Sequence, residues 1–192
     1  MKLKLSITAM LCAAFGSLAQ AGPVTYTEQT TGSGTLDGNP FTSALLTFTF
    51  TGDTTNVTNP LAGIFANSGT ATVSIAGISG TATFTDTMLA VDNQGIDEAG
   101  IGDMTTNSAL LFTSDQAFGS YDLTTSIGPV NGSAIYSPNV DFATDAGTFI
   151  LSSPPGQSTY TATLSSGAAE PSTALLLLVG PALLVCRSRK QH

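Results

Sequence analysis

The sequence predicts an all-β fold for most of the chain, an antiparallel β-sandwich of roughly 8–10 strands. Three observations predict it. Threonine alternates with aliphatic or aromatic residues in several short runs, most clearly from Leu46 to Thr51. Clusters of Gly, Asn, Asp and Pro separate these runs at short intervals, as turn residues do. The middle of the sequence also lacks the apolar stripe that a helix of three turns would carry.

The expected strands follow one another from residue 24 onward. In chain order they are residues 24–27, 46–51, 71–75, 81–85, 110–112, 133–136, 148–151 and 159–164. A Gly-Ile-Ser-Gly turn at residues 77–80 divides the third from the fourth, and residues 152–158 form a loop before the last. Because Phe and Tyr recur at alternating spacing through these runs, we expect one folded core and not a disordered, low-complexity segment.

The 192-residue chain carries 13 acidic and 5 basic side chains, and the two kinds are separated along the sequence. The basic residues are Lys2, Lys4, Arg187, Arg189 and Lys190, and the single histidine is His192. All 13 carboxylates lie between Leu5 and Cys186, where no Lys, Arg or His occurs. We therefore expect an anionic body that does not bind nucleic acid, because phosphate contacts need cations.

The same separation removes the side chains that most enzymes use. Between Leu5 and Cys186 there is no His base, Lys nucleophile or Arg clamp, so a Ser-His-Asp triad and a zinc site are both excluded. A glycosidase needs only two carboxyl groups. Sugar subsites usually add Trp, however, and the chain has none. We expect a protein without enzymatic activity, with a carboxylate glycosidase as the enzymatic alternative.

The N-terminus has the three parts of a secretory signal peptide. They are the charged residues Lys2 and Lys4, the apolar run 5–18, and the cleavage motif Ala19-Gln20-Ala21. We expect cleavage after Ala21, so that the mature chain begins at Gly22-Pro23 and loses Cys12 with the signal. The alternative interpretation is a buried N-terminal helix, which would not explain the charged start or the cleavage motif.

The C-terminus also has three parts. They are Glu170-Pro171-Ser172-Thr173, the apolar run 174–186, and the basic cluster of Arg187, Arg189 and Lys190. As a helix, residues 172–186 would span roughly 22 Å, less than the hydrocarbon core of about 30 Å. Pro181 weakens that helix further, and the basic cluster would stay on the cytoplasmic side. This segment is suited to transient membrane anchoring during processing.

This tripartite tail resembles the PEP-CTERM sorting signal, the substrate of exosortase enzymes in Gram-negative bacteria. Glu170, Pro171, Ser172 and Thr173 match its motif, whereas Ala169 stands where the family has its first proline. The resemblance covers about the last 25 residues. It implies export by the general secretion machinery, then processing by an exosortase-type membrane enzyme. Its members are thought to join the exopolysaccharide matrix of biofilms, and the final location is the cell surface or that matrix. An ordinary single-pass transmembrane anchor is the alternative.

The sequence thus divides into four segments. Residues 1–21 are the signal peptide, 22–164 the β-domain, 165–169 a linker, and 170–192 the sorting signal. The last comprises the motif 170–173, a hydrophobic helix 174–186 and a basic tail 187–192.

The densest polar cluster of the body lies between residues 92 and 103. Its oxygen-bearing side chains are Asp92, Asn93, Asp97, Glu98 and Asp103, interspersed with glycines. Hard oxygen ligands of this kind suit Ca²⁺, although the spacing is not that of an EF-hand. The simpler interpretation, which we favour, is a solvated acidic loop without a cofactor. The alternative function is a Ca²⁺-dependent module that binds a glycan or a protein through this loop.

Overall fold

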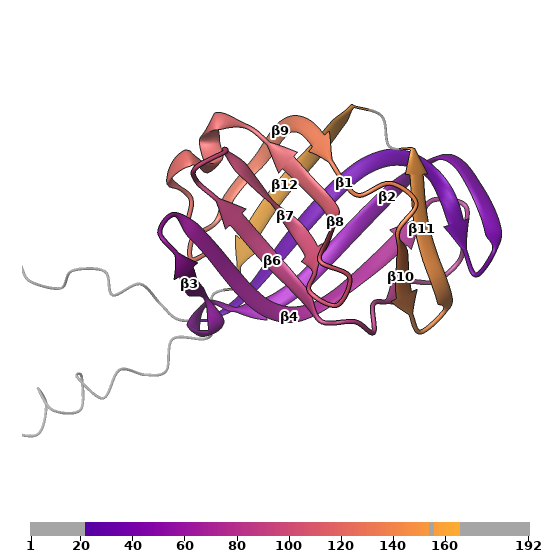
Figure 1. Cartoon of the computed structure of the whole chain (residues 1–192), viewed down its shortest axis with the longest axis horizontal. Coiled ribbons are helices and arrows are strands. Elements are labelled where there is room, and N and C mark those ends of the chain that lie inside the picture. Colours follow the sequence, from indigo (N-terminus) through magenta and orange to yellow (C-terminus); the bar gives the residue numbers. More distant parts are fainter. Residues whose placement is uncertain (1–21, 154–155, 166–192) are drawn as a thin grey trace, which may run out of the picture.

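The computed structural model describes residues 22–153 and 156–165. These residues form twelve strands and two short 3-10 helices (Figure 1). The strands are β1 (Pro23–Leu36), β2 (Asn39–Asp53), β3 (Thr58–Leu61), β4 (Ile64–Ile75), β5 (Ala82–Thr83), β6 (Met88–Asn93), β7 (Glu98–Asp103), β8 (Ser108–Ser114), β9 (Ile127–Ile135), β10 (Asp141–Thr144), β11 (Gly147–Ser153) and β12 (Gln157–Leu164). The 3-10 helices are η1 (Thr54–Asn56) and η2 (Gln116–Ser120).

The predicted all-β class is confirmed, but the sheet is closed into a barrel and is not a sandwich. Its strand order is β1-β12-β9-β8-β7-β6-β4-β2, and β2 pairs again with β1, so these eight strands close into a ring. Alternation of polar and apolar residues shows which side of a strand faces inward. It does not show whether that inner side faces a second sheet or the far wall of a barrel, and this is why the prediction of a sandwich is corrected here to a barrel.

Three long strands, β1, β2 and β4, extend through both ends of the body. β1 pairs with β12 over Val24–Gln29 and with β11 over Ser33–Leu36. β4 changes partner in the same way, from β6 to β5. The change in β1 coincides with a bulge at Gly34, where an added Cβ would collide with the backbone oxygen of Ile150.

We call the two ends of the body the phenylalanine lobe and the polar lobe. The phenylalanine lobe contains β5, β10 and β11, and is closed by a bridge between Phe84 and Thr144. Its buried core includes Phe41, Phe48, Phe84, Phe142 and Phe149. The polar lobe contains β6 to β9 and β12, and buries Tyr26, Glu28, Asn67, Asp92 and Tyr160. Both lobes share β1, β2 and β4.

Most expected strands fall inside observed ones. Residues 24–27, 46–51, 71–75, 110–112, 148–151 and 159–164 lie in β1, β2, β4, β8, β11 and β12, whereas 81–85 shortens to β5 and 133–136 extends backward into β9. The region expected to be an acidic loop is instead the hairpin of β6 and β7. The sequence prediction missed it because acidic residues and glycines are typical of turns, and here they lie within strands.

Gly22 and Ser165 lie side by side at one end of the barrel. β1 begins and β12 ends there, with Val24 opposite Leu164 and the Ser165 amide donating to the Pro23 oxygen at 2.9 Å. None of the helices in residues 22–153 and 156–165 has the length and hydropathy of a membrane span. The expected signal peptide, the sorting motif, the hydrophobic segment 174–186 and the basic tail lie outside the described residues.

Candidate functional site

The five candidate Ca²⁺ ligands of the alternative interpretation occupy both ends of the β6–β7 hairpin. Asp92 is in β6 and points into the barrel, where it is fully buried. Asn93 caps the turn by accepting the Gly95 amide at 3.1 Å, and Asp97 forms the turn with a positive φ of 56°. Glu98 starts β7 opposite Asn93, whereas Asp103 ends β7 opposite Met88.

The structure therefore does not bring these five residues together. Glu98 and Asp103 are five steps apart along an extended strand, which is about 17 Å. Asp103 is occupied by its own turn, because its carboxylate accepts the Thr105 amide and the Thr106 hydroxyl, each at 2.7 Å. Within residues 22–153 and 156–165, no group of three or more His, Cys, Asp or Glu side chains is placed to hold a metal ion.

The interior of the polar lobe holds buried polar side chains from four strands. Glu28 on β1, Asn67 on β4, Asp92 on β6 and Tyr160 on β12 have no exposed surface. The Tyr26 hydroxyl lies among them, where it accepts the Asn67 amide at 2.9 Å and donates to the Leu123 carbonyl at 2.7 Å. These contacts fix Tyr26, and they leave five buried atoms without a hydrogen-bond partner among the described residues: Glu28 Oε2, Asn67 Oδ1, both carboxylate oxygens of Asp92 and the Tyr160 hydroxyl.

Burial favours the protonated form of both buried carboxyls. Burial raises the pKa of Asp92 to about 8, and the negative charges of Asp122 and Asp97 add to the rise. Burial also raises the pKa of Glu28 well above its usual range, against the lowering effect of its hydrogen bonds from Thr113. Since the described body has no Lys, Arg or His, no cation stabilises either charge, and the neutral acid is the form that fits this interior.

The segment after β8 closes this end of the barrel. η2 and the loop that follows bury Phe118, Tyr121 and Leu123. The rings of Phe118 and Tyr121 lie 5.3 and 6.1 Å from that of Tyr160, both edge-on. The Gln94 side chain donates to the Tyr121 carbonyl at 2.7 Å, so the β6–β7 turn holds the segment from outside while Tyr26 holds it from inside.

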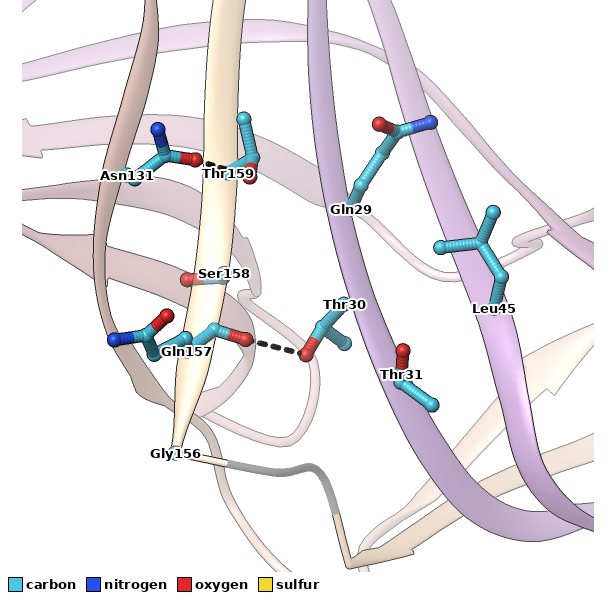
Figure 2. Close-up of a pocket in the computed structure, with 9 residues that line it drawn as sticks. All are labelled: Gln29, Thr30, Thr31, Leu45, Asn131, Gly156, Gln157, Ser158 and Thr159. Atoms are coloured by element: carbon cyan, nitrogen blue, oxygen red, sulfur yellow. Dashed lines mark hydrogen bonds between the residues drawn. The ribbon is translucent and has the colours of Figure 1, made fainter.

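A groove opens in the barrel wall where β1 leaves β12 (Figure 2). It has a volume of about 410 Å³, within the range of small-molecule sites. Its lining residues are Gln29, Thr30, Thr31, Leu45, Asn131, Gly156, Gln157, Ser158 and Thr159. None of these side chains ionises, although the chain as a whole has a formal charge of −8.

Hydrogen bonds orient two of the groove's amides. The Thr159 hydroxyl donates to the Asn131 oxygen at 2.7 Å, which leaves the Asn131 NH₂ group available as a donor. The Gln29 NH₂ group donates to the Thr47 hydroxyl at 3.1 Å, on the side away from β12. The Gln29 oxygen is therefore available as an acceptor, and Figure 2 shows it on the side toward β12. The Gln157 side chain extends from β12 on the same side as Asn131, away from Gln29 (Figure 2).

The groove floor connects to the buried interior. Thr30 and Ser158 form this floor and are 4% and 3% exposed. The Thr30 hydroxyl donates to the Gln157 carbonyl at 2.8 Å and joins β1 to β12 at the point where their pairing ends. Behind it, the Ser158 and Thr113 hydroxyls are 2.7 Å apart, and Thr113 donates to Glu28 Oε1 at 3.1 Å.

The sequence prediction did not identify the groove or the buried carboxyls. One signal was present for Glu28, because it continues the inward alternation of Val24 and Tyr26. The groove had no such signal, since Gln29, Asn131 and Gln157 are far apart in sequence and resemble the other polar positions of exposed strand faces. No family model, curated protein or solved structure matches the chain.

Proposed function

We propose that the chain is an exported protein of the cell surface or exopolysaccharide matrix, sorted by an exosortase-type enzyme, with a non-catalytic β-barrel body. The observation that carries the proposal is the pairing of two terminal signals around a body without basic residues. Residues 1–21 have the parts of a signal peptide, and residues 170–192 have the motif, apolar run and basic cluster of a sorting tail.

The barrel suits this role in two ways. Gly22 and Ser165 lie side by side, so the first and last described residues are at the same end of the barrel. The groove, whose nine lining residues include no Asp, Glu, His, Cys or Lys, has the composition of a binding surface and lacks a general acid or base.

Intact-mass analysis of protein from the surface and medium fractions of its native host tests the proposal. We expect a species that begins at Gly22 and ends near Glu170, because both signals are removed. A species that keeps Arg187 to His192 would contradict sorting and indicate a resident membrane protein.

A deletion of residues 170–192 provides the second arm. We expect the truncated chain to be exported but no longer retained at the surface. If its distribution equals that of the full chain, the tail has no sorting role and the proposal fails.

A further inference from the structure

We propose that the groove between β12 and β1 binds a neutral, hydroxyl-rich polysaccharide chain. This deepens the proposed function and rests on it, because only an exported body meets extracellular polysaccharide. The groove differs from the Ca²⁺ loop considered from the sequence, since it lies on the barrel wall and its donors and acceptors are amides and hydroxyls.

The first argument is the unpaired edge of β1. Backbone pairing with β12 ends at Gln29, and pairing with β11 starts at Ser33, so within residues 22–153 and 156–165 no strand pairs with residues 30–32 on this edge. Thr30 and Ser158 close the floor with hydroxyl groups, and the groove is open above them. A ligand in this opening would lie across the wall of the barrel, where a long chain can pass through without having to end.

The second argument is the complementarity of the available groups. The Asn131 NH₂ group is a donor and the Gln29 oxygen is an acceptor, each set by the hydrogen bond that its other amide atom makes. A sugar hydroxyl both donates and accepts, so hydroxyls along a polysaccharide chain can satisfy the donor on β9 and the acceptor on β1, which lie on either side of β12. Leu45, which is 49% exposed, adds an apolar contact for the C–H face of a sugar.

The third argument is charge. Twelve carboxylates lie in the described residues, and none of them lines the groove. A positively charged ligand would be drawn to the acidic faces, and a polyanion would be repelled by the body as a whole. An uncharged opening in an anionic body therefore favours a neutral ligand.

The groove contains no aromatic side chain, so each site is expected to bind weakly. A polymer with repeated units compensates for this, because several barrels can bind along one chain and each bound unit raises the local concentration of the next. This is why the ligand class is a polysaccharide and not a free monosaccharide.

Affinity electrophoresis of the full chain tests the assignment, in a detergent whose headgroup is not a sugar. The probes cast into the gel are a β-1,4-glucan, a β-1,3-glucan, an α-1,6-glucan and a galactomannan, with polygalacturonate as the anionic comparison. The variants are Asn131→Ala and Gln157→Ala, and Gln116→Ala in η2 is the matched control. Each groove variant loses one side-chain amide, and we expect its apparent affinity to fall by about three- to tenfold.

Retardation by at least one neutral polymer that is weakened in both groove variants and unchanged in Gln116→Ala supports the assignment. Equal retardation of all variants places binding elsewhere and overturns it. Retardation by polygalacturonate alone, or by none of the five polymers, also overturns it. None of these outcomes depends on the sorting tail. The mass analysis can therefore support sorting while the electrophoresis rejects the groove, and the electrophoresis can support the groove while the mass analysis rejects sorting.

Discussion

The two lobes share β1, β2 and β4 and one apolar core, but only the polar lobe adds buried carboxyl groups to it. In the phenylalanine lobe, Phe149 packs edge-on against Phe48 and Phe84 at 5.7 and 5.9 Å. In the polar lobe, Glu28 and Asp92 are buried with no cation among the described residues to neutralise them. Burial of aromatic surface stabilises the first lobe at any pH. In the second lobe, burial raises the pKa of both carboxyls and favours their neutral forms, so its stability is expected to depend on pH. The same long strands thus join a region that provides stability to a region that is tuned by solution conditions.

The largest expected effect is in the phenylalanine lobe. Phe149→Ala removes a fully buried ring that contacts three other phenylalanines, and should lower the free energy of unfolding by about 3–5 kcal/mol. Phe112→Ala, at a half-buried position in β8, is the control and should cost less than half as much. Urea denaturation measures both. Equal losses of unfolding free energy in the two variants would contradict the special contribution of the buried phenylalanine cluster.

The next effect separates the lobes by pH. Because burial raises the pKa of Asp92 from 3.8 to about 8, the folded chain keeps a proton that the unfolded chain releases. Stability is therefore greatest below pH 4 and falls by about 1 kcal/mol per pH unit as the pH rises toward 8. Glu28, whose pKa burial also raises, contributes in the same direction.

Asp92→Asn should reduce this slope, because the amide stays neutral at every pH. Denaturation curves at several pH values between 4 and 8 measure the slope in both proteins. Asp141→Asn, on the exposed side of β10, is the control and should keep the wild-type slope. A stability that rises between pH 4 and 8 in the wild type would show that the buried carboxyls are charged in the fold.

A smaller loss is expected at Tyr26, which joins the polar interior to the closing segment. Tyr26→Phe removes the donor to Leu123 and the acceptor for Asn67, and should cost about 1–3 kcal/mol. Amide hydrogen exchange of residues 121–124 should accelerate more than that of β11. Tyr136→Phe loses only an exposed bond of 3.3 Å to the Ser152 carbonyl and is the matched control. Uniform exchange across both lobes would argue against a local role for Tyr26.

The smallest effect concerns the hydroxyl behind the groove. Thr113→Val keeps the shape but leaves Glu28 Oε1 and Ser158 without this partner, and should cost about 1–2 kcal/mol. Thr51→Val, on the exposed face of β2, should change the free energy of unfolding by no more than about 0.5 kcal/mol. Thermal melting compares the two. A neutral Thr113→Val would mean that the hydroxyl chain does not stabilise the interior.

Alternation in the sequence predicted the strands whose inner positions are apolar. Leu46, Phe48 and Phe50 all face inward as their spacing required. The alternation did not predict β6 and β7. One inward position of β6 is Asp92, and β7 has Gly100 opposite Val91, so neither strand shows a regular polar and apolar alternation. An acidic residue on the buried side gives the same local signal as an exposed one, and only the tertiary structure reveals that no water reaches it.

Closure and the groove depend on contacts that no local pattern encodes. β1 is read correctly as a strand from residues 24–27, but its second half and its change of partner follow from the fold. The groove needs Gln29, Asn131 and Gln157 on three different strands, and their proximity is a result of the register of β1, β12 and β9. The sequence prediction therefore identified most of the elements and missed the site that they form.

The position of β12 has a mechanical consequence. Leu164 is beside the exit of the chain, and Gln157, at the other end of the same strand, borders the groove. A pull between the C-terminal end and a polymer held in the groove would act along the length of β12. The backbone hydrogen bonds that join β12 to β1 and β9 would then bear the force together, and would not break one after another. A body held at these two points would resist shear, which is the stress that flowing water imposes on a surface layer.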